Sequence, residues 1–227
     1  MIHPDTELRF VNDEIGYGIF ATASIPKGTI VYVKDCLEIE VTEEKYKDMD
    51  VVCQGIVEKY SYIDERGIRI VSWDNAKYVN HSCNCNSMST GYGFEIAIRH
   101  IEKGEEITDE YGLFNSPFPI EVNCGCSGCR KTVHNTDIDR FYKDWDQRIK
   151  EAFRSLNEVP QPLLPLMDSE SVSELLDYLS GGSSYRSVRR LKYSPAGSGN
   201  GYKRLKRAAK EKMEANCSPS HLASLNI

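Results

Sequence analysis

Short runs of apolar and β-branched residues alternate with turn-forming Gly, Asp and Asn residues from residue 8 to about residue 112. Runs of this length and irregular spacing predict the strands of several small sheets rather than a wound α/β sheet. One short helix is expected at residues 43–54. The predicted strands are 28–33, 36–41, 68–73 and 94–101.

The pattern becomes helical after Arg130. Thr136 is the expected N-cap of a helix whose apolar residues recur at helical spacing and should pack on the rest of the domain. These apolar residues are Ile138, Phe141, Tyr142, Trp145, Ile149, Ala152, Phe153 and Leu156.

The last part of the chain is interrupted repeatedly. Three prolines break regular structure at 158–168, and a short helix is predicted at 171–180. The Gly- and Ser-rich stretch 194–201 predicts a flexible linker, and residues 202–214 are a candidate basic helix.

The composition is that of a folded protein. The chain has 227 residues, of which 40% are hydrophobic and 10% aromatic, enough for one sizeable domain with an appendage or for two small domains. The N-terminus lacks a signal-peptide pattern, and no apolar run approaches the ~20 residues of a membrane span. We therefore expect a soluble intracellular protein, cytoplasmic or nuclear. In that reducing setting the eight cysteines should be free thiols or metal ligands.

Charge is unevenly distributed along the sequence. The net charge is −6, yet residues 186–214 carry ten Lys or Arg against two Asp or Glu. The rest of the chain therefore carries −14. An acidic body would attract basic segments of other proteins, and the basic tail could contact nucleic acid or dock on the body. Both could equally be solvated surface.

Three cysteines, Cys124, Cys126 and Cys129, lie within six residues of one another in a Gly-rich stretch. Three thiolates at this spacing can bind Zn²⁺, and a fourth ligand would have to come from His81, Cys83 or Cys85. The alternative is a group of unligated thiols. His81 and Cys83 could also form a base and nucleophile. We expect their side chains to point apart, however, and no Asp or Asn is evidently placed to orient the imidazole.

Several motifs occur in a specific order: "GYGIFATASIPKGTIV" at 16–31, "YVNHSC" at 78–83, "KGEEITDEYG" at 103–112, and then the three cysteines. Together they resemble a SET-domain protein-lysine methyltransferase with a post-SET zinc loop. The resemblance spans roughly residues 8–130. It implies a mainly β fold of several small sheets with a pseudoknot, followed by a post-SET loop and an α-helical extension.

The resemblance also implies roles for particular residues. Binding of S-adenosylmethionine would fall to Gly16, Tyr17, Gly18, Asn80, His81 and Tyr111. Tyr111 would be the catalytic tyrosine, and a structural Zn²⁺ would be held by Cys83, Cys124, Cys126 and Cys129. Tyr62, Trp73, Tyr92 and Asp109 are candidates for the wall of the substrate channel. Each of these residues could instead have a purely structural role in a turn or in the core.

The sequence departs from the family pattern at two positions. Cys85 stands where proline is common, and it is a second candidate for the zinc ligand assigned to Cys83. Asp109 stands two residues before the catalytic tyrosine, where an aromatic residue is common and helps to set the number of methyl groups added. The degree of methylation is therefore open.

The expected function is transfer of a methyl group to a lysine of a protein substrate with a basic segment, such as a histone tail. The alternatives are a non-catalytic, zinc-stabilised binding module that uses its basic tail and, less in keeping with the motifs, a cysteine hydrolase. The expected segments are a SET domain (1–115), a post-SET zinc loop (116–134), a helical extension (135–180) and a basic, partly flexible tail (181–227).

Overall fold

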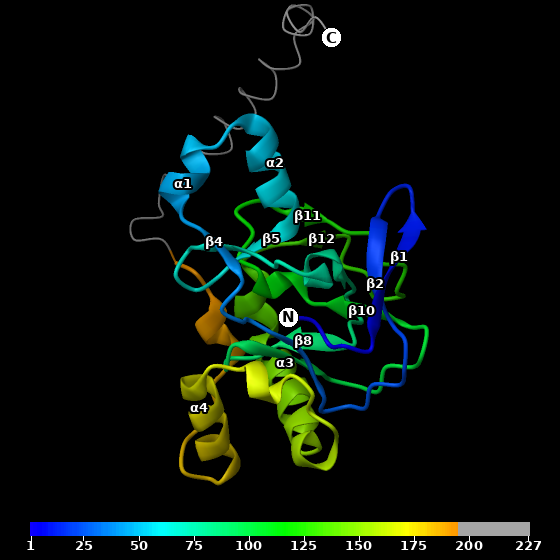
Figure 1. Ribbon diagram of the computed structural model, residues 1–227, viewed down its shortest axis with the longest axis vertical. Coiled ribbons are helices and arrows are strands. Elements are labelled where there is room, and N and C mark those ends of the chain that lie inside the picture. The colour runs from blue at the N-terminus through cyan, green and yellow to red at the C-terminus, as the bar shows by residue number, and fades with distance from the viewer. Residues whose placement is uncertain (195–227) are drawn as a thin grey trace, which may run out of the picture. The chain divides into compact units, whose positions relative to one another are not determined.

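The computed structural model describes residues 1–194, and Met1–Tyr193 form one compact unit. Small sheets occupy most of the chain up to residue 133, and two longer helices follow them (Figure 1). The predicted fold class, mainly β with a helical C-terminal part, is confirmed. Within residues 1–194, no helix combines the length and apolar character needed to cross a membrane.

The four-stranded sheet positions the site. Its central strand β10 is antiparallel to β2 on one side and parallel to β7 on the other, where Thr108 pairs with Asn80 and Asp109 with His81. Sequence segments from three separate parts of the chain therefore lie side by side. In spatial order the strands are β1 (Thr6–Asn12), β2 (Gly16–Ala21), β10 (Glu106–Asp109) and β7 (Asn80–His81).

Three smaller sheets complete the β part, and each predicted strand overlaps an observed one. The strand expected from residue 36 begins only at Ile39, because the Asp35 carboxylate accepts the N–H of Leu37 and holds a turn there. The sheets are β3 (Ile30–Val33), β9 (Phe94–Ala97) and β8 (Ser87–Ser89); β4 (Ile39–Val41), β6 (Arg69–Val71) and β5 (Ser61–Ile63); and β11 (Ile120–Glu121) with β12 (Thr132–Val133).

The single helix predicted at 43–54 is wrong in its extent. Two helices occupy this region, α1 (Glu43–Asp48) and α2 (Val51–Tyr60). Met49 is extended, and the Asp50 side chain then accepts the backbone N–H of Cys53 at 2.8 Å, which starts a new helix. An aspartate inside a helical pattern here acts as a cap.

The long helix α3 (Asp137–Phe153) follows the prediction closely. Most of its apolar stripe is buried, whereas Phe141 is 37% exposed. Thr136 occupies the N-cap position without a side-chain capping bond, and its backbone is helical (φ −88°, ψ −6°) rather than extended as in a capping residue. The buried members of the stripe, Ile138, Trp145, Ile149, Ala152, Phe153 and Leu156, belong to the largest core cluster.

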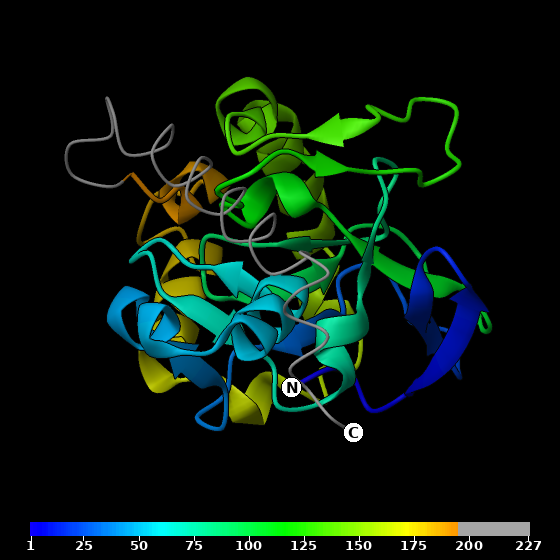
Figure 2. The same cartoon turned by 90° about the horizontal axis from the view of Figure 1, so that it is seen from above.

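The helix predicted at 171–180 is α4 (Ser169–Leu179). Figure 2 shows the same structure from above. The Pro-rich stretch before α4 contains only single 3₁₀ turns. The 3₁₀ turns among residues 1–194 are η1 (Asn75–Tyr78), η2 (Tyr111–Leu113), η3 (Leu156–Glu158), η4 (Leu164–Leu166) and η5 (Val188–Leu191).

The first part of the basic segment docks on the body. Val188 is fully buried, and its backbone N–H donates to Asp146 of α3 at 2.9 Å. Lys192 pairs with Asp139 of the same helix, and Arg186 pairs with Glu174 of α4. The linker predicted at 194–201, from its second residue on, and the basic helix predicted at 202–214 lie outside the described residues.

Replacing Ile149 with alanine tests the assignment of α3 to the core. Ile149 is fully buried, so Ile149→Ala should lower the free energy of unfolding by about 2–5 kcal/mol through lost apolar contacts and a residual cavity. Lys143→Ala, on the exposed face of the same helix, should change it by less than about 0.5 kcal/mol. Chemical denaturation measures both, and equal effects would contradict the assignment.

Candidate functional site

At Gly18 of β2, the side chains of Glu106 and Asn80 occupy the space that a Cβ would need. A Cβ on this residue would lie 2.9 Å from Asn80 Nδ2 and would collide with the Glu106 carboxylate. The neighbouring Gly16 has a φ of +84°, a conformation that other residues rarely adopt. Glycine is thus required at the two positions for different reasons. At Gly16 the backbone has a positive φ, and at Gly18 neighbouring side chains occupy the space of a Cβ.

Asn80 joins three strands through its side-chain amide. Its Nδ2 donates to the Tyr17 carbonyl at 3.0 Å and to Glu106 Oε1 at 2.7 Å. Both amide protons are therefore used within the sheet. The amide oxygen accepts no hydrogen bond from any residue of the described part, so it is the group of Asn80 left for a ligand.

His81 turns its ring inward. Nδ1 lies 3.0 Å from the Asp109 carbonyl and 3.2 Å from the Tyr111 nitrogen, and Nε2 lies 3.2 Å from Cys83 Sγ. Burial, followed by the charge of Arg130, lowers the pKa of His81 to about 4. The ring is neutral and fully engaged at neutral pH, so any ligand at His81 would meet its backbone.

The expectation that His81 and Cys83 point apart is wrong. Residues two apart share a face of an extended chain, and the two side chains are in contact at 3.2 Å. Their chemistry nevertheless argues against a nucleophile and its base. Burial raises the pKa of the Cys83 thiol, and an imidazole with a pKa of about 4 cannot hold the thiol proton at neutral pH.

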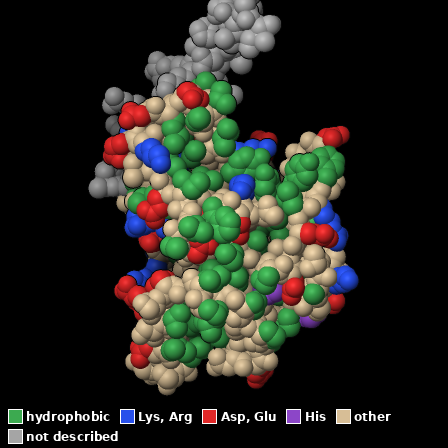
Figure 3. Space-filling model, viewed as in Figure 1, with side chains coloured by type: hydrophobic (Ala, Val, Ile, Leu, Met, Phe, Trp, Pro, Cys, Tyr) green, Lys and Arg blue, Asp and Glu red, His purple; other side chains and the backbone are tan. Residues whose placement is uncertain are grey.

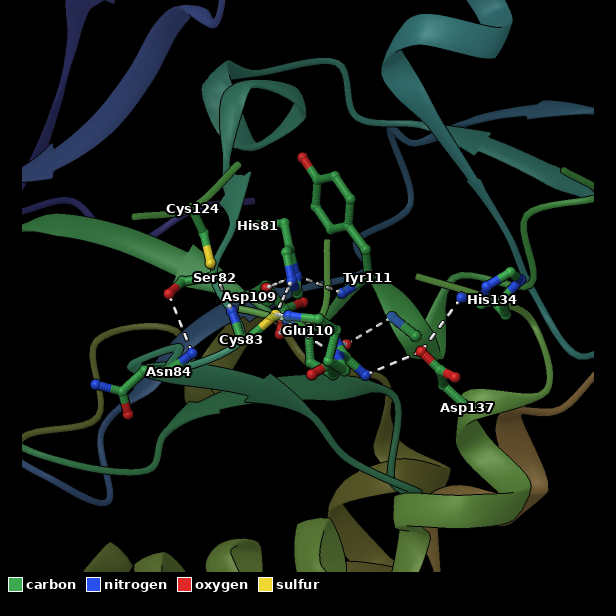
Figure 4. A network of polar contacts seen from close by, with 12 residues as sticks. His81, Ser82, Cys83, Asn84, Asp109, Glu110, Tyr111, Cys124, His134 and Asp137 are labelled. Atoms are coloured by element: carbon green, nitrogen blue, oxygen red, sulfur yellow. Dashed lines mark hydrogen bonds and ion pairs between the residues drawn. The ribbon is translucent and has the colours of Figure 1, made fainter. Parts of the chain in front are cut away.

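Tyr111 begins the 3₁₀ turn that follows β10. Its hydroxyl donates to the Val79 carbonyl at 2.8 Å, which fixes the ring against the segment that carries Asn80. The ring packs against Phe114 at 4.9 Å and against His81 at 5.3 Å between centroids. Burial raises the pKa of Tyr111, so its hydroxyl stays protonated. In Figure 4 this ring points away from Cys83 and Glu110.

Four cysteines gather where the expected zinc site lies. The sulfurs of Cys83, Cys124 and Cys129 all lie within 4.8 Å of one another, and Cys126 Sγ is 3.3 Å from Cys124 Sγ. Tetrahedral zinc with Zn–S bonds of ~2.3 Å would separate its sulfurs by roughly 3.8 Å. The spacing of Cys83, Cys124 and Cys129 therefore fits Zn²⁺, whereas Cys126 lies beside Cys124 but is not within 4.8 Å of both other sulfurs.

Cys85 lies elsewhere. Its side chain is fully buried in the core cluster that contains Met88 and Ile96, and burial raises the pKa of its thiol. A thiol in such a place is held neutral and far from the polar loop. The geometry favours Cys83 over Cys85 as the fourth ligand.

Arg130 connects the cysteine cluster to the rest of the protein. Its backbone N–H and its Nε both donate to Cys83 Sγ, at 3.3 and 3.4 Å. Its other guanidinium nitrogens pair with Glu110, which is 2% exposed, and with Asp137 at the start of α3. One side chain thus links the cluster, the residue before Tyr111 and the long helix.

A pocket of about 290 Å³ opens beside Tyr111. Its wall includes three acidic residues, Glu58, Glu95 and Asp109, among aromatic rings. An apolar, concave site with a few convergent polar groups is typical of a ligand-binding pocket. The aromatic residues of the wall are Tyr32, Tyr60, Tyr62, Tyr111, Phe114 and Phe118.

Of the four residues expected to line the substrate channel, two line this pocket and two lie elsewhere. Tyr62 and Asp109 line this pocket. Trp73 does not; it is 42% exposed, and its Nε1 donates to Asp35. Tyr92 is buried in the core, where its hydroxyl accepts the N–H of Arg186 at 3.0 Å.

Sequence reasoning missed Arg130, Glu95 and the pocket's further aromatic residues. Arg130 directly follows the last cysteine of the cluster, and a cation next to thiolates is a signal that could have been used. Glu95 stands between two apolar residues of a strand, a pattern that usually means exposure to solvent. Nothing in the local sequence shows that this face borders a pocket.

Arg130→Met should be strongly destabilising, because it leaves the buried Glu110 carboxylate without its cation. We expect the free energy of unfolding to fall by about 3–5 kcal/mol, measured by chemical denaturation. Arg99→Met removes the same charge from a solvent-exposed pair with Glu105 and should cost no more than about 1 kcal/mol. Equal losses in the two variants would show that Arg130 has no special structural role.

The family comparison agrees with this geometry. Residues 16–112 match the family model of the SET domain. The matched segment begins at Gly16 and ends at Gly112, so it includes Asn80, His81 and Tyr111.

Curated relatives are much longer than this chain. The histone-lysine N-methyltransferase trr of Drosophila melanogaster is 29% identical over 133 residues, covering 52% of this chain and 5% of the relative. The histone H3-lysine(4) N-trimethyltransferase ATX1 of Arabidopsis thaliana is 30% identical over 138 residues, covering 55% and 13%.

Among solved structures, KRYPTONITE in complex with mCHG DNA and SAH matches 56% of this chain and 30% of its own, with 20% identity and a TM-score of 0.37. The family model covers the part of the chain that holds the strands β2, β7 and β10 and Tyr111. Residues 16–112 of this chain therefore match the SET-domain family.

Proposed function

We propose that this protein is a protein-lysine N-methyltransferase that uses S-adenosylmethionine. The observation that carries the proposal is the position of Tyr111. It lines an aromatic pocket, and its hydroxyl is fixed to the chain segment that leads into Asn80. A pocket for a substrate side chain and a candidate seat for a methyl donor thus meet at one residue.

The seat for the methyl donor would be formed by Gly16, Tyr17, Gly18, Asn80 and His81, together with Tyr111. S-adenosylmethionine supplies the methyl group when bound. One feature of these residues fits a ligand with N–H donors: the amide oxygen of Asn80, which has no partner within residues 1–194. Tyr17, 49% exposed, adds an aromatic surface beside them.

The pocket would prepare the amine for reaction. A lysine side chain has a pKa of ~10.4 in water and almost no free lone pair at neutral pH. Aromatic walls that exclude water disfavour its charged form. The Tyr111 hydroxyl, held by Val79, would orient the amine for in-line attack; positioning of this kind lowers a barrier without proton transfer.

Zinc would be structural and held by Cys83, Cys124, Cys126 and Cys129. Burial raises the pKa of Cys124, but hydrogen bonds from the backbone N–H groups of Cys83 and Cys126 and from neighbouring thiols lower it to about 6. A thiolate in the cluster suits a Zn²⁺ site. The ion would tie residues 116–134, the proposed post-SET loop, to the segment that carries Asn80.

We propose a protein substrate whose target lysine lies in a basic segment, such as a histone tail. The relatives are named as histone-lysine methyltransferases. Outside residues 186–214 this chain carries a net charge of −14, which would steer a basic segment toward it. Methylation of histones and of cell lysate, followed by mass spectrometry, would identify the modified lysine.

Tyr111→Phe tests the catalytic role. It removes only the hydroxyl, so the affinity for S-adenosylmethionine in calorimetry should stay within about threefold while methyl transfer falls by about 100-fold or more. Tyr142→Phe on α3 is the matched control and should leave transfer unchanged. Unchanged transfer in Tyr111→Phe would remove this role, and failure of the wild type to bind S-adenosylmethionine would favour a non-catalytic binding module.

Cys126→Ser tests the metal site. The wild type should contain close to one equivalent of zinc, and the variant should lose most of it and unfold at a lower temperature, because metal binding and folding of such loops are coupled. Elemental analysis and thermal unfolding measure the two effects. Cys53→Ser, at an exposed thiol of α2, should change neither. A wild type without zinc would refute the site.

A further inference from the structure

Asn115 joins three backbone segments through one side chain. Its Nδ2 donates to the Ile63 carbonyl at 2.9 Å and to the Leu191 carbonyl at 2.7 Å, and its Oδ1 accepts the N–H of Tyr193 at 2.9 Å. The residue is buried and has a φ of +52°, a conformation that Asn adopts more readily than most residues. The three hydrogen bonds are thus largely shielded from water, where an unpaired group is costly.

The first of these segments is the strand β5, which lies at the edge of its sheet. An edge strand leaves backbone groups without a partner strand. Both backbone groups of Ile63 are bound by residues outside the sheet: its N–H donates to the Phe114 carbonyl at 3.0 Å, and its carbonyl accepts a hydrogen bond from Asn115. Residues 114 and 115 therefore hold β5 in place.

The same two residues follow directly after the turn that begins with Tyr111. The ring centroids of Tyr111 and Phe114 are 4.9 Å apart, and the ring of Tyr62 on β5 lies 5.6 Å from that of Phe114. All three rings line the pocket of about 290 Å³ beside Tyr111. The position of β5 relative to Asn115 therefore sets the distance between two walls of this pocket.

The other two partners of Asn115 belong to residues 185–193, which we call the C-terminal strap. Val188 fixes the strap to the body of the fold, since it is fully buried and donates its N–H to Asp146 of α3. At the end of the strap, the ring of Tyr193 packs on the turn between β5 and β6, where a Cβ on Gly67 would meet this ring at 2.5 Å. The strap thus gives Asn115 a fixed support and contacts the β5–β6 hairpin a second time.

We propose that Asn115 is a positioning residue for the reaction: it ties β5 to the C-terminal strap and so fixes Tyr62 in the wall of the substrate pocket. This inference rests on the proposed methyltransferase function. Asn115 is not among the residues that line the pocket, so it acts through Ile63 and Tyr62 rather than by contact with the substrate. Its loss should loosen this wall and weaken substrate binding, while the Tyr111 hydroxyl keeps its own hydrogen bond.

Two substitutions remove the tie in different ways. Asn115→Gly removes all three hydrogen bonds and suits the positive φ. Asn115→Asp keeps the shape and the acceptor for Tyr193, but its carboxylate has no N–H to donate to Ile63 and Leu191. The exposed Asn157 of η3 provides the matched controls, Asn157→Gly and Asn157→Asp. Circular dichroism confirms folding, and Asn115→Gly decides the question alone if Asn115→Asp does not fold.

The first measurement needs no activity. The zinc-loaded protein is labelled with 3-fluorotyrosine, and the fluorine resonance of Tyr62 is assigned with Tyr62→Phe. This resonance should move or broaden in both Asn115 variants, because the ring shifts relative to Phe114, and should stay in place in both Asn157 variants. The resonance of Tyr17 on β2, assigned with Tyr17→Phe, should stay in place in all four variants.

The second measurement is methyl transfer to core histones. In both Asn115 variants the KM for histones should rise about tenfold, through the lost hydrogen bonds. The kcat and the affinity for S-adenosylmethionine should stay within about twofold, because the interactions lost are not confined to the transition state. Loss of folded protein alone would lower kcat and leave KM unchanged, so the rise in KM separates positioning from stability. Both Asn157 variants should match the wild type.

An unchanged Tyr62 resonance in the Asn115 variants would overturn the inference, as would a fall in kcat with KM unchanged. The proposed function fails separately. Transfer that is normal in Asn115→Gly and lost in Tyr111→Phe keeps the function and loses this inference. If the wild type does not bind S-adenosylmethionine, the proposed function is lost, and the Tyr62 resonance still decides whether Asn115 holds the pocket wall.

Discussion

The position of strand β10 between β2 and β7 is the constraint on which the site depends. This four-residue strand pairs with the glycine-containing strand on one side and with the Asn80 segment on the other. Parallel pairing with β7 fixes the register, so Tyr111, two residues past the end of β10, always emerges at the same point. A slip of one residue would turn Asp109 away from the pocket and move Tyr111 away from Val79.

Buried charge holds the neighbouring parts to this strand. Glu110 follows β10 directly, and its carboxylate both accepts the N–H of Gly112 and pairs with Arg130. Because the same guanidinium also contacts Cys83 and Asp137, the cysteine cluster and the long helix share one anchor. Polar networks of this kind are costly when incomplete, which favours a single arrangement of these three segments.

The sequence predicted the pieces of the site better than their contacts. The stripe of α3 and the positions of the strands β3, β6 and β9 follow from apolar periodicity, which reports burial directly. The break at Asp50 was missed because an aspartate caps a helix only where the preceding residue leaves the helical conformation. Three features depend on tertiary packing, because each is set by the segment that packs against a short strand. They are the contact of His81 with Cys83, the burial of Cys85 and the position of Glu95 at the pocket.

Several apolar side chains are exposed on the surface of the protein. Apolar side chains lie over α2 and over the β1–β2 hairpin in Figure 3. Val51, Val52 and Ile56 of α2 are at least half exposed, as is Phe10 of β1. These residues are not needed for the core, so their substitution should be tolerated far better than substitution of the residues that border β10.

Gly18, in contrast, should tolerate substitution poorly. The space for a Cβ at this position is filled by the Glu106 carboxylate and the Asn80 amide, the two groups that hydrogen-bond to each other. A side chain at position 18 would therefore have to displace both of them. Gly18→Ala, the smallest substitution, would show how far the Glu106 and Asn80 side chains can move.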